Sequence, residues 1–73
     1  MDRRRVNDKV TANISQAIVA AGTDTSTIAR AVGMDRSEME NRLTPEVGLS
    51  LSELVHVGGA LRVPPGLLLA GVA

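Results

Sequence analysis

The side chains that most often carry catalysis or bind metals are scarce in this sequence. Its 73 residues include no cysteine and one histidine, His56. Disulfides and thiolate metal sites are therefore excluded, and one imidazole cannot form a metal site alone. Only Ser52 and Glu53 stand at helical spacing before His56, which gives no nucleophile–base pair. No glycine-rich loop between a strand and a helix is present to hold a phosphate group. The sequence therefore predicts no enzyme, cofactor, metal or small-molecule ligand, and places His56 on the surface.

Polar side chains suited to specific hydrogen bonding gather near the middle of the chain. Met39 and Leu43 are four residues apart and share one face of a predicted helix. Three polar side chains then lie on the outer face: Arg36, Ser37 and Asn41. The spacing leaves two interpretations open, because such a face either binds a partner or is simply solvated.

The hydrophobic pattern predicts an all-α chain that forms one compact domain over residues 1–73. There is no aromatic residue, and the β-branched residues that favour strands do not cluster. The core must therefore consist of Leu, Val, Ile, Met and Ala. Five short helices are expected at about 6–21, 25–32, 36–43 and 51–62, with a last one beginning at Pro64 and Pro65.

Several residues mark where these helices begin and end. Asp24 and Asp35 are predicted N-caps, and Ser50 with Glu53 matches the capping box. Gly33 is expected to end the second helix, because glycine tolerates the left-handed backbone that the following turn needs. The second and third helices are thus predicted to be joined by a tight turn.

Small residues mark the places where helices are expected to approach closely. Ala29 is placed at the crossing of the second and third helices, and Gly58 and Gly59 are expected to permit close packing of the fourth. The inner face of that fourth helix is predicted to hold Leu51, Leu54, Val55, Gly58 and Leu61.

Two stretches of the sequence resemble a known family. The stretch T-x-x-I-A-R-A-V-G-M-D-R-S-E-M-x-N-R-L is similar to the helix-turn-helix of lambda-repressor-like (Cro/repressor, XRE-type) regulators. The later S-L-S-E-L-V-H-V-G-G-A-L-R-V-P-P-G-L-L-L-A-G resembles the fourth and fifth helices of that family. The resemblance implies a bundle with a helix-turn-helix at its second and third helices. It also implies a bacterial or bacteriophage transcriptional regulator, typically a repressor, that binds specific sites in double-stranded DNA.

The resemblance also implies roles for individual residues. Arg36, Ser37 and Asn41 would face base edges in the major groove, where Arg36 suits guanine and Asn41 suits adenine. The side chains implied as phosphate contacts are Thr25, Arg42, Arg3, Arg4 and Arg5. Residues 1–5 are expected to form a basic arm that is either disordered or reaches DNA.

Two acidic residues, Glu38 and Glu40, lie on or beside the predicted recognition helix. Carboxylates repel phosphate, so they would weaken nonspecific binding, but a Glu also accepts a hydrogen bond from cytosine N4. The sequence leaves open which of the two effects operates.

The family implies a homodimer on a palindromic operator. Three consecutive leucines in the last helix cannot all face one core, so some apolar surface should be exposed. The interface is expected at Leu67, Leu69 and Val72. The alternative for Leu67 is burial against the first helix of its own subunit.

The charge distribution gives only weak support to DNA binding. The net charge is zero, with six basic and four acidic residues over 1–36 and two basic and four acidic residues over 37–73. A tight nonspecific DNA binder is usually basic. The alternative function is therefore a protein-interaction module on the same scaffold, such as an antitoxin-type partner. With no long apolar run and a polar start, the chain is expected in the cytoplasm, without membrane contact.

Overall fold

A computed structural model describes residues 3–71, and none of these residues lies in a strand. The helices in this part of the chain are α1 (Arg3–Ala20), α2 (Thr25–Ala31), α3 (Arg36–Arg42), α4 (Leu51–Leu61) and α5 (Pro65–Leu68). The all-α prediction and the order of the five segments are confirmed for this part of the chain. Within it, no helix combines the length and the apolar character needed to cross a membrane.

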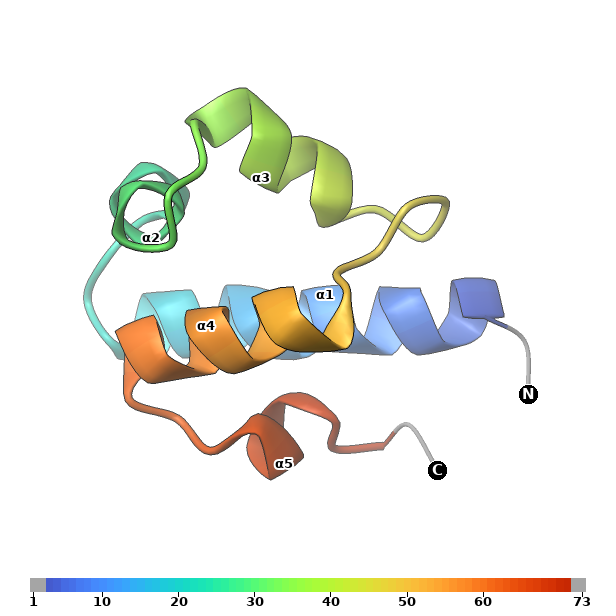
Figure 1. Cartoon of the computed structure of the whole chain (residues 1–73). Coiled ribbons are helices and arrows are strands. Elements are labelled where there is room, and N and C mark those ends of the chain that lie inside the picture. Colours follow the sequence, from blue (N-terminus) through green and yellow to red (C-terminus); the bar gives the residue numbers. More distant parts are fainter. Residues whose placement is uncertain (1–2, 72–73) are drawn as a thin grey trace.

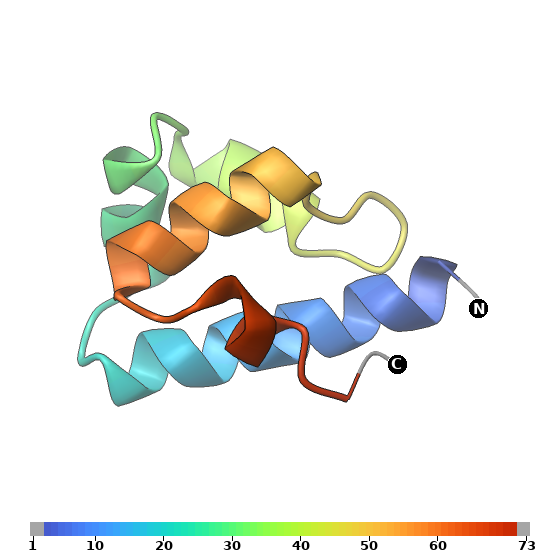
Figure 2. The same ribbon diagram turned by 60° about the horizontal axis from the view of Figure 1, so that its bottom comes forward.

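The helices are arranged around the long α1. In Figure 1, α1 and α4 run across the middle of the molecule, with α2 and α3 above them and α5 below. The short α2 packs against both α3 and α4, and α5 packs against both α1 and α4. Figure 2 shows α5 lying over α1 and α4 on the face turned away from α3. The surface of α3 and the surface of α5 are therefore separate.

The core is a single cluster to which all five helices contribute. Its buried side chains are Val10, Ile14, Ile18, Ile28, Ala29, Met39, Leu54, Val57, Leu61 and Leu68. The expectation of an entirely aliphatic core is thus confirmed. The four shorter helices, α2 to α5, gain most of their stability from such packing, because isolated helices under about 12–15 residues are marginal in water.

The predicted helix starts are confirmed by their caps. Asp24 accepts a hydrogen bond from the Thr27 N–H at 2.8 Å. Ser50 accepts from the Glu53 N–H at 3.1 Å, and the Glu53 carboxylate accepts from the Ser50 N–H at 2.8 Å. These bonds satisfy N–H groups that have no partner inside the helix. The turn between α2 and α3 also has its expected form, since Gly33 has a φ of +79°.

The start of the chain differs from the prediction. Arg3, Arg4 and Arg5 form the first turn of α1, so the prediction of a disordered arm is wrong for these three residues. Arginine is a good helix former, and a long helix already begins at Val6 in the pattern, so the helix extends backwards at little cost. The remaining two residues of the predicted arm lie outside the described part of the chain.

The inner face of α4 was predicted partly wrongly. Leu54, Gly58 and Leu61 are buried as expected, but Leu51 and Val55 are exposed, and Val57 is fully buried instead. The predicted and the observed inner residues both recur every three or four positions, as one face of a helix requires, because apolar residues occupy most of α4. The contacts with α2 and α5 decide between them.

The two glycines of α4 occupy different surroundings. A Cβ on Gly58 would lie 2.8 Å from the backbone oxygen of Val63, whereas a Cβ on Gly59 would meet nothing within 4 Å. The expectation of close packing is therefore confirmed at Gly58 and wrong at the exposed Gly59.

This difference predicts opposite effects of alanine at the two positions. Gly59→Ala should stabilise the protein by about 0.5–1 kcal/mol, because alanine loses less backbone entropy in a helix. Gly58→Ala should destabilise it, since backbone atoms must move to admit the methyl group. Thermal unfolding followed by circular dichroism measures both effects. Equal melting temperatures for the two variants would contradict the tight contact at Gly58.

Candidate functional site

The outer face of α3 carries the polar side chains singled out in the sequence. Arg36, Ser37 and Asn41 are all exposed. The opposite face is fixed to the core by Met39, which is fully buried, and by Leu43, which is half-buried against the cluster. The structure therefore brings the three predicted base-reading residues together on one solvent-facing surface.

Arg36 forms an ion pair along this face. Its Nε lies 2.7 Å from Oε1 of Glu40, one helical turn later, with side chains 69% and 56% exposed. Such exposed i,i+4 pairs contribute only about 0.3–0.5 kcal/mol, because water screens them. The pair therefore orients Arg36 weakly and is easily exchanged for another partner. The bond uses Nε and not the two terminal nitrogens of the guanidinium group.

Glu38 is turned toward the start of α3. Asp35 accepts a hydrogen bond from the Glu38 N–H at 2.7 Å, and the Glu38 carboxylate accepts from the Asp35 N–H at 3.4 Å. This is a reciprocal capping box. A carboxylate in the first turn also interacts favourably with the helix dipole. Glu38 thus has a structural role that accounts for its acidic side chain.

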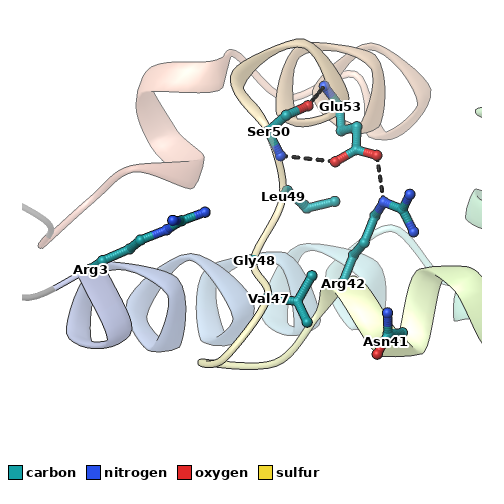
Figure 3. A pocket seen from close by; sticks show the side chains of 8 residues that line it. All are labelled: Arg3, Asn41, Arg42, Val47, Gly48, Leu49, Ser50 and Glu53. Atoms are coloured by element: carbon teal, nitrogen blue, oxygen red, sulfur yellow. Dashed lines mark hydrogen bonds and ion pairs between the residues drawn. The ribbon is translucent and has the colours of Figure 1, made fainter.

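Arg42 ends α3 and points toward the start of α4. Its Nε donates to Oε2 of Glu53 at 2.5 Å, and the two side chains are 31% and 24% exposed. Figure 3 shows this pair beside the Ser50 cap, with Arg3 reaching toward the same hollow from α1. Asn41 and Val47 also line this hollow. The pKa of the Glu53 carboxyl is lowered chiefly by the Ser50 N–H, with Arg42 as a further cause.

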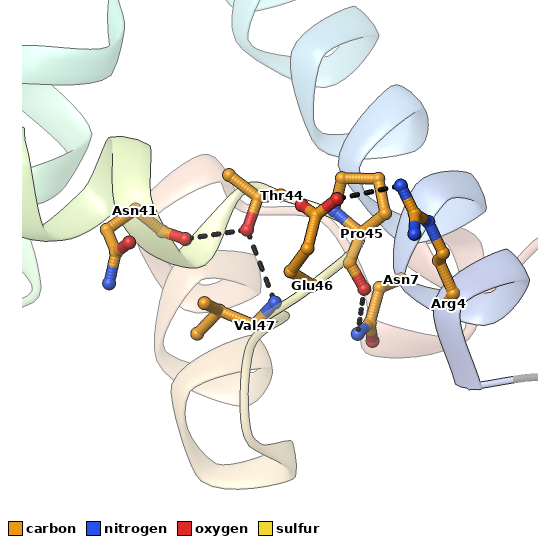
Figure 4. Close-up of polar contacts among 7 residues, drawn as sticks. All are labelled: Arg4, Asn7, Asn41, Thr44, Pro45, Glu46 and Val47. Carbon is orange, nitrogen blue, oxygen red and sulfur yellow. Dashed lines mark hydrogen bonds and ion pairs between the residues drawn. The ribbon is translucent and has the colours of Figure 1, made fainter.

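The connection between α3 and α4 is held against α1. The Arg4 guanidinium lies 2.8 Å from Glu46 Oε1, and Asn7 Nδ2 donates to the Pro45 carbonyl at 3.0 Å. Within the connection, the Thr44 hydroxyl donates to the Asn41 carbonyl at 2.9 Å. Figure 4 shows these contacts gathered at one bend of the chain. They fix the segment that follows the exposed face of α3.

The five predicted phosphate contacts are spread over three helices. Thr25 is half-buried at the start of α2. Asp24, the residue before Thr25, caps α2 with its carboxylate. The pKa of the Asp24 carboxyl is lowered chiefly by the hydrogen bond from the backbone N–H of Thr27. Arg3 lines one hollow together with Asn41 and Arg42. Arg4 and Arg5 line a second hollow beside Asp8 and Pro45.

No family model, curated protein or solved structure matches this chain. The functional assignment therefore depends on the geometry of the chain itself.

The predicted interface residues lie on α5 and after it. Leu68 is 1% exposed. Its neighbours in the chain, Leu67 and Leu69, are 62% and 37% exposed. The expectation that the three leucines cannot share one core is confirmed, and burial of Leu67 against α1 is not observed. Val72 lies outside the described residues.

The end of α5 is fixed by a polar contact that the sequence does not reveal. Asn13 Nδ2 donates to the carbonyl oxygens of Leu68 and Ala70, each at 2.9 Å. The contacts of Arg4, Asn7 and Arg42 were also not predicted. Each joins residues at least 11 positions apart. Helical periodicity carries no information about such pairs.

Proposed function

We propose that this protein is a sequence-specific double-stranded DNA-binding regulator of the lambda-repressor-like type. In this proposal, α2 and α3 form the helix-turn-helix, and α3 is the recognition helix. The observation that carries the proposal is the exposed face of α3. It holds Arg36, Ser37 and Asn41 on a helix that α2 and the core keep in place.

The chemistry of this face suits the major groove. An arginine can donate two hydrogen bonds to guanine O6 and N7, and an asparagine can exchange two with adenine N6 and N7. Arg36 and Ser37 occupy the first turn of α3, and the first turn of a recognition helix is the part that enters the groove. We assign base contacts to Arg36, Ser37 and Asn41 and phosphate contacts to Thr25 and the arginines of the first turn of α1.

The chain has no net charge, so a single copy is only weakly attracted to DNA phosphates. The proposal therefore includes two copies of the protein bound to one DNA site. The molecule measures 31 × 22 × 19 Å, whereas successive major grooves on one side of DNA are about 34 Å apart. One copy therefore places one recognition helix in one groove. A homodimer through Leu67 and Leu69 would supply the second recognition helix, provided that its two-fold axis turns both α3 helices toward the same side of the DNA.

The proposal is tested by selecting bound sites from random duplex DNA. We expect enrichment of a palindromic sequence whose half-sites are about 10 base pairs apart, centre to centre. Titration with the selected duplex at several salt concentrations then gives the affinity and the number of phosphate contacts. Failure to enrich any sequence would refute the proposal.

Replacing Arg36 by alanine is expected to weaken binding to the selected site by about 1–3 kcal/mol and to relax the preference at one base pair. The reason is the loss of paired donors to one base. Arg30→Ala is the matched control, because Arg30 is an exposed arginine in the last turn of α2, outside the proposed recognition helix. Fluorescence anisotropy with the selected duplex and its single-base variants measures the effect. If Arg36→Ala and Arg30→Ala behaved alike, Arg36 would not be a base contact.

One observation favours the second candidate, a protein-interaction module. The charged side chains of α3 are Arg36, Glu38, Glu40 and Arg42, and both arginines are paired with carboxylates. The charge on this helix is therefore balanced. Retention on duplex DNA that decreases with added salt distinguishes the two functions, since an interaction module of this kind should not be retained.

A further inference from the structure

We propose that the Arg42–Glu53 pair is a joint that positions the recognition helix, and that Arg42 acts through this joint instead of contacting phosphate. This inference rests on the proposed function, because it concerns how α3 is presented to DNA. It assigns Glu53, a residue of α4, a part in sequence recognition without any contact to DNA.

The first support is the burial of the pair. The Arg42 and Glu53 side chains are 31% and 24% exposed, compared with 69% and 56% for Arg36 and Glu40 on the outer face. A partly buried ion pair is less screened by water than an exposed one. Both pairs have similar chemistry, but only the first is sheltered enough to hold two helices together.

The second support is the position of the pair in the chain. Arg42 is the last residue of α3, and Glu53 is the third residue of α4. The Glu53 carboxylate caps α4 through one oxygen and accepts from Arg42 through the other. One carboxylate therefore fixes the start of α4 and the end of α3 together.

The third support is that α3 has few other attachments. It packs chiefly on α2, while α4 packs chiefly on α2 and α5. The connection between α3 and α4 is itself tied to α1 by Arg4 and Asn7. The Arg42–Glu53 pair adds a direct link between the two helices at the end of α3, next to Asn41.

The Arg42–Glu53 pair lies where it can fix the placement of α3, and hydrogen bonds from α3 to bases depend on that placement. Hydrogen bonds to base edges require distances of about 2.7–3.2 Å and near-linear geometry, so a small shift of α3 breaks them. Long, flexible side chains can follow a phosphate through the same shift. Losing the joint should therefore reduce affinity for the specific site and leave affinity for random duplex nearly unchanged.

The test is a double-mutant cycle with Glu53→Gln and Arg42→Gln. Glutamine at position 53 can still accept from the Ser50 N–H, so the capping box is preserved and only the charge that holds Arg42 is lost. Asp8→Asn is the matched control, because it removes an exposed carboxylate of α1 instead of one that joins α3 to α4. All variants are compared at a temperature where circular dichroism shows them folded.

We expect each single variant to bind the selected duplex roughly 5- to 30-fold more weakly, which corresponds to about 1–2 kcal/mol. The double variant should be no weaker than either single one, because both remove the same interaction. Binding to random duplex and the salt dependence should stay as in the parent, and Asp8→Asn should bind as the parent does. Simple unfolding would lower specific and random binding together.

Two results would overturn the inference. If Arg42→Gln reduced the salt slope by about one and Glu53→Gln strengthened binding, Arg42 would be a phosphate contact that Glu53 restrains. If the same cycle on the melting temperature of the free protein gave additive effects, the pair would not form in solution. The melting cycle needs no DNA. A parent that binds DNA without sequence preference would refute the proposed function, while the melting cycle would still decide whether the joint exists.

Discussion

Replacing Ala29 by leucine is expected to lower the stability of this protein by about 1–3 kcal/mol or more. Ala29 is fully buried in the core cluster. It belongs to α2, which packs against both α3 and α4. A leucine there has no space, so α2 must move away from its neighbours. In a domain of this size each kcal/mol lowers the melting temperature by roughly 4–8 °C.

Thermal unfolding of Ala29→Leu followed by circular dichroism measures this effect. Ala31→Leu is the matched control, because Ala31 lies on the same helix but is exposed. It should melt within a few degrees of the parent. An Ala29→Leu protein as stable as the Ala31→Leu protein would contradict the close packing of α2, and the proposed helix-turn-helix would lose its structural basis.

Much of this fold is predictable because the signals for it are local. Asp24 and Ser50 cap the helices that follow them, and Gly33 takes the left-handed backbone that ends α2. Each of these residues acts within three or four positions of itself, so the sequence alone specifies the helix boundaries to within a few residues. Met39 and Leu43 likewise share a face because of helical spacing alone.

The errors occur where several arrangements satisfy the same local rule. Apolar residues fill most of α4, so periodicity permits Val55 as well as Val57 in the core, and packing against other helices selects Val57. A run of arginines at the start is compatible with a free arm or with a helix, and the structure has the helix.

The candidate site is predictable only in part for a related reason. The outer position of Ser37 and Asn41 follows from the inner position of Met39, because residues two positions apart on a helix point to opposite sides. Arg36 stands three positions before Met39, so its exposure depends on the tertiary packing of α3. The partner of Arg42 does not follow from any spacing, because Glu53 belongs to another helix and is brought near by the tertiary fold. Contacts of this type appear only when the elements are placed in three dimensions.

Replacing Leu67 by glutamate is expected to yield a folded monomer that binds its operator roughly 100-fold more weakly or worse. Leu67 is 62% exposed beside the buried Leu68, so it contributes little to the core of its own subunit. In the proposed dimer it would contact its two-fold symmetry mate, where two glutamates would repel each other in an apolar contact. Losing the dimer halves the phosphate and base contacts that one binding event makes.

The measurement combines three methods on the parent and on two variants. Sedimentation reports the mass, circular dichroism the fold, and anisotropy the affinity for the complete operator and for a single half-site. Val19→Glu is the control, since it places the same charge on an exposed apolar residue of α1. We expect it to dimerise as the parent does. The half-site should be bound equally by Leu67→Glu and by the parent, because α3 lies away from α5. A parent that stays monomeric both free and on its operator would contradict the dimer, and the neutral chain would then have to obtain its affinity from one recognition helix.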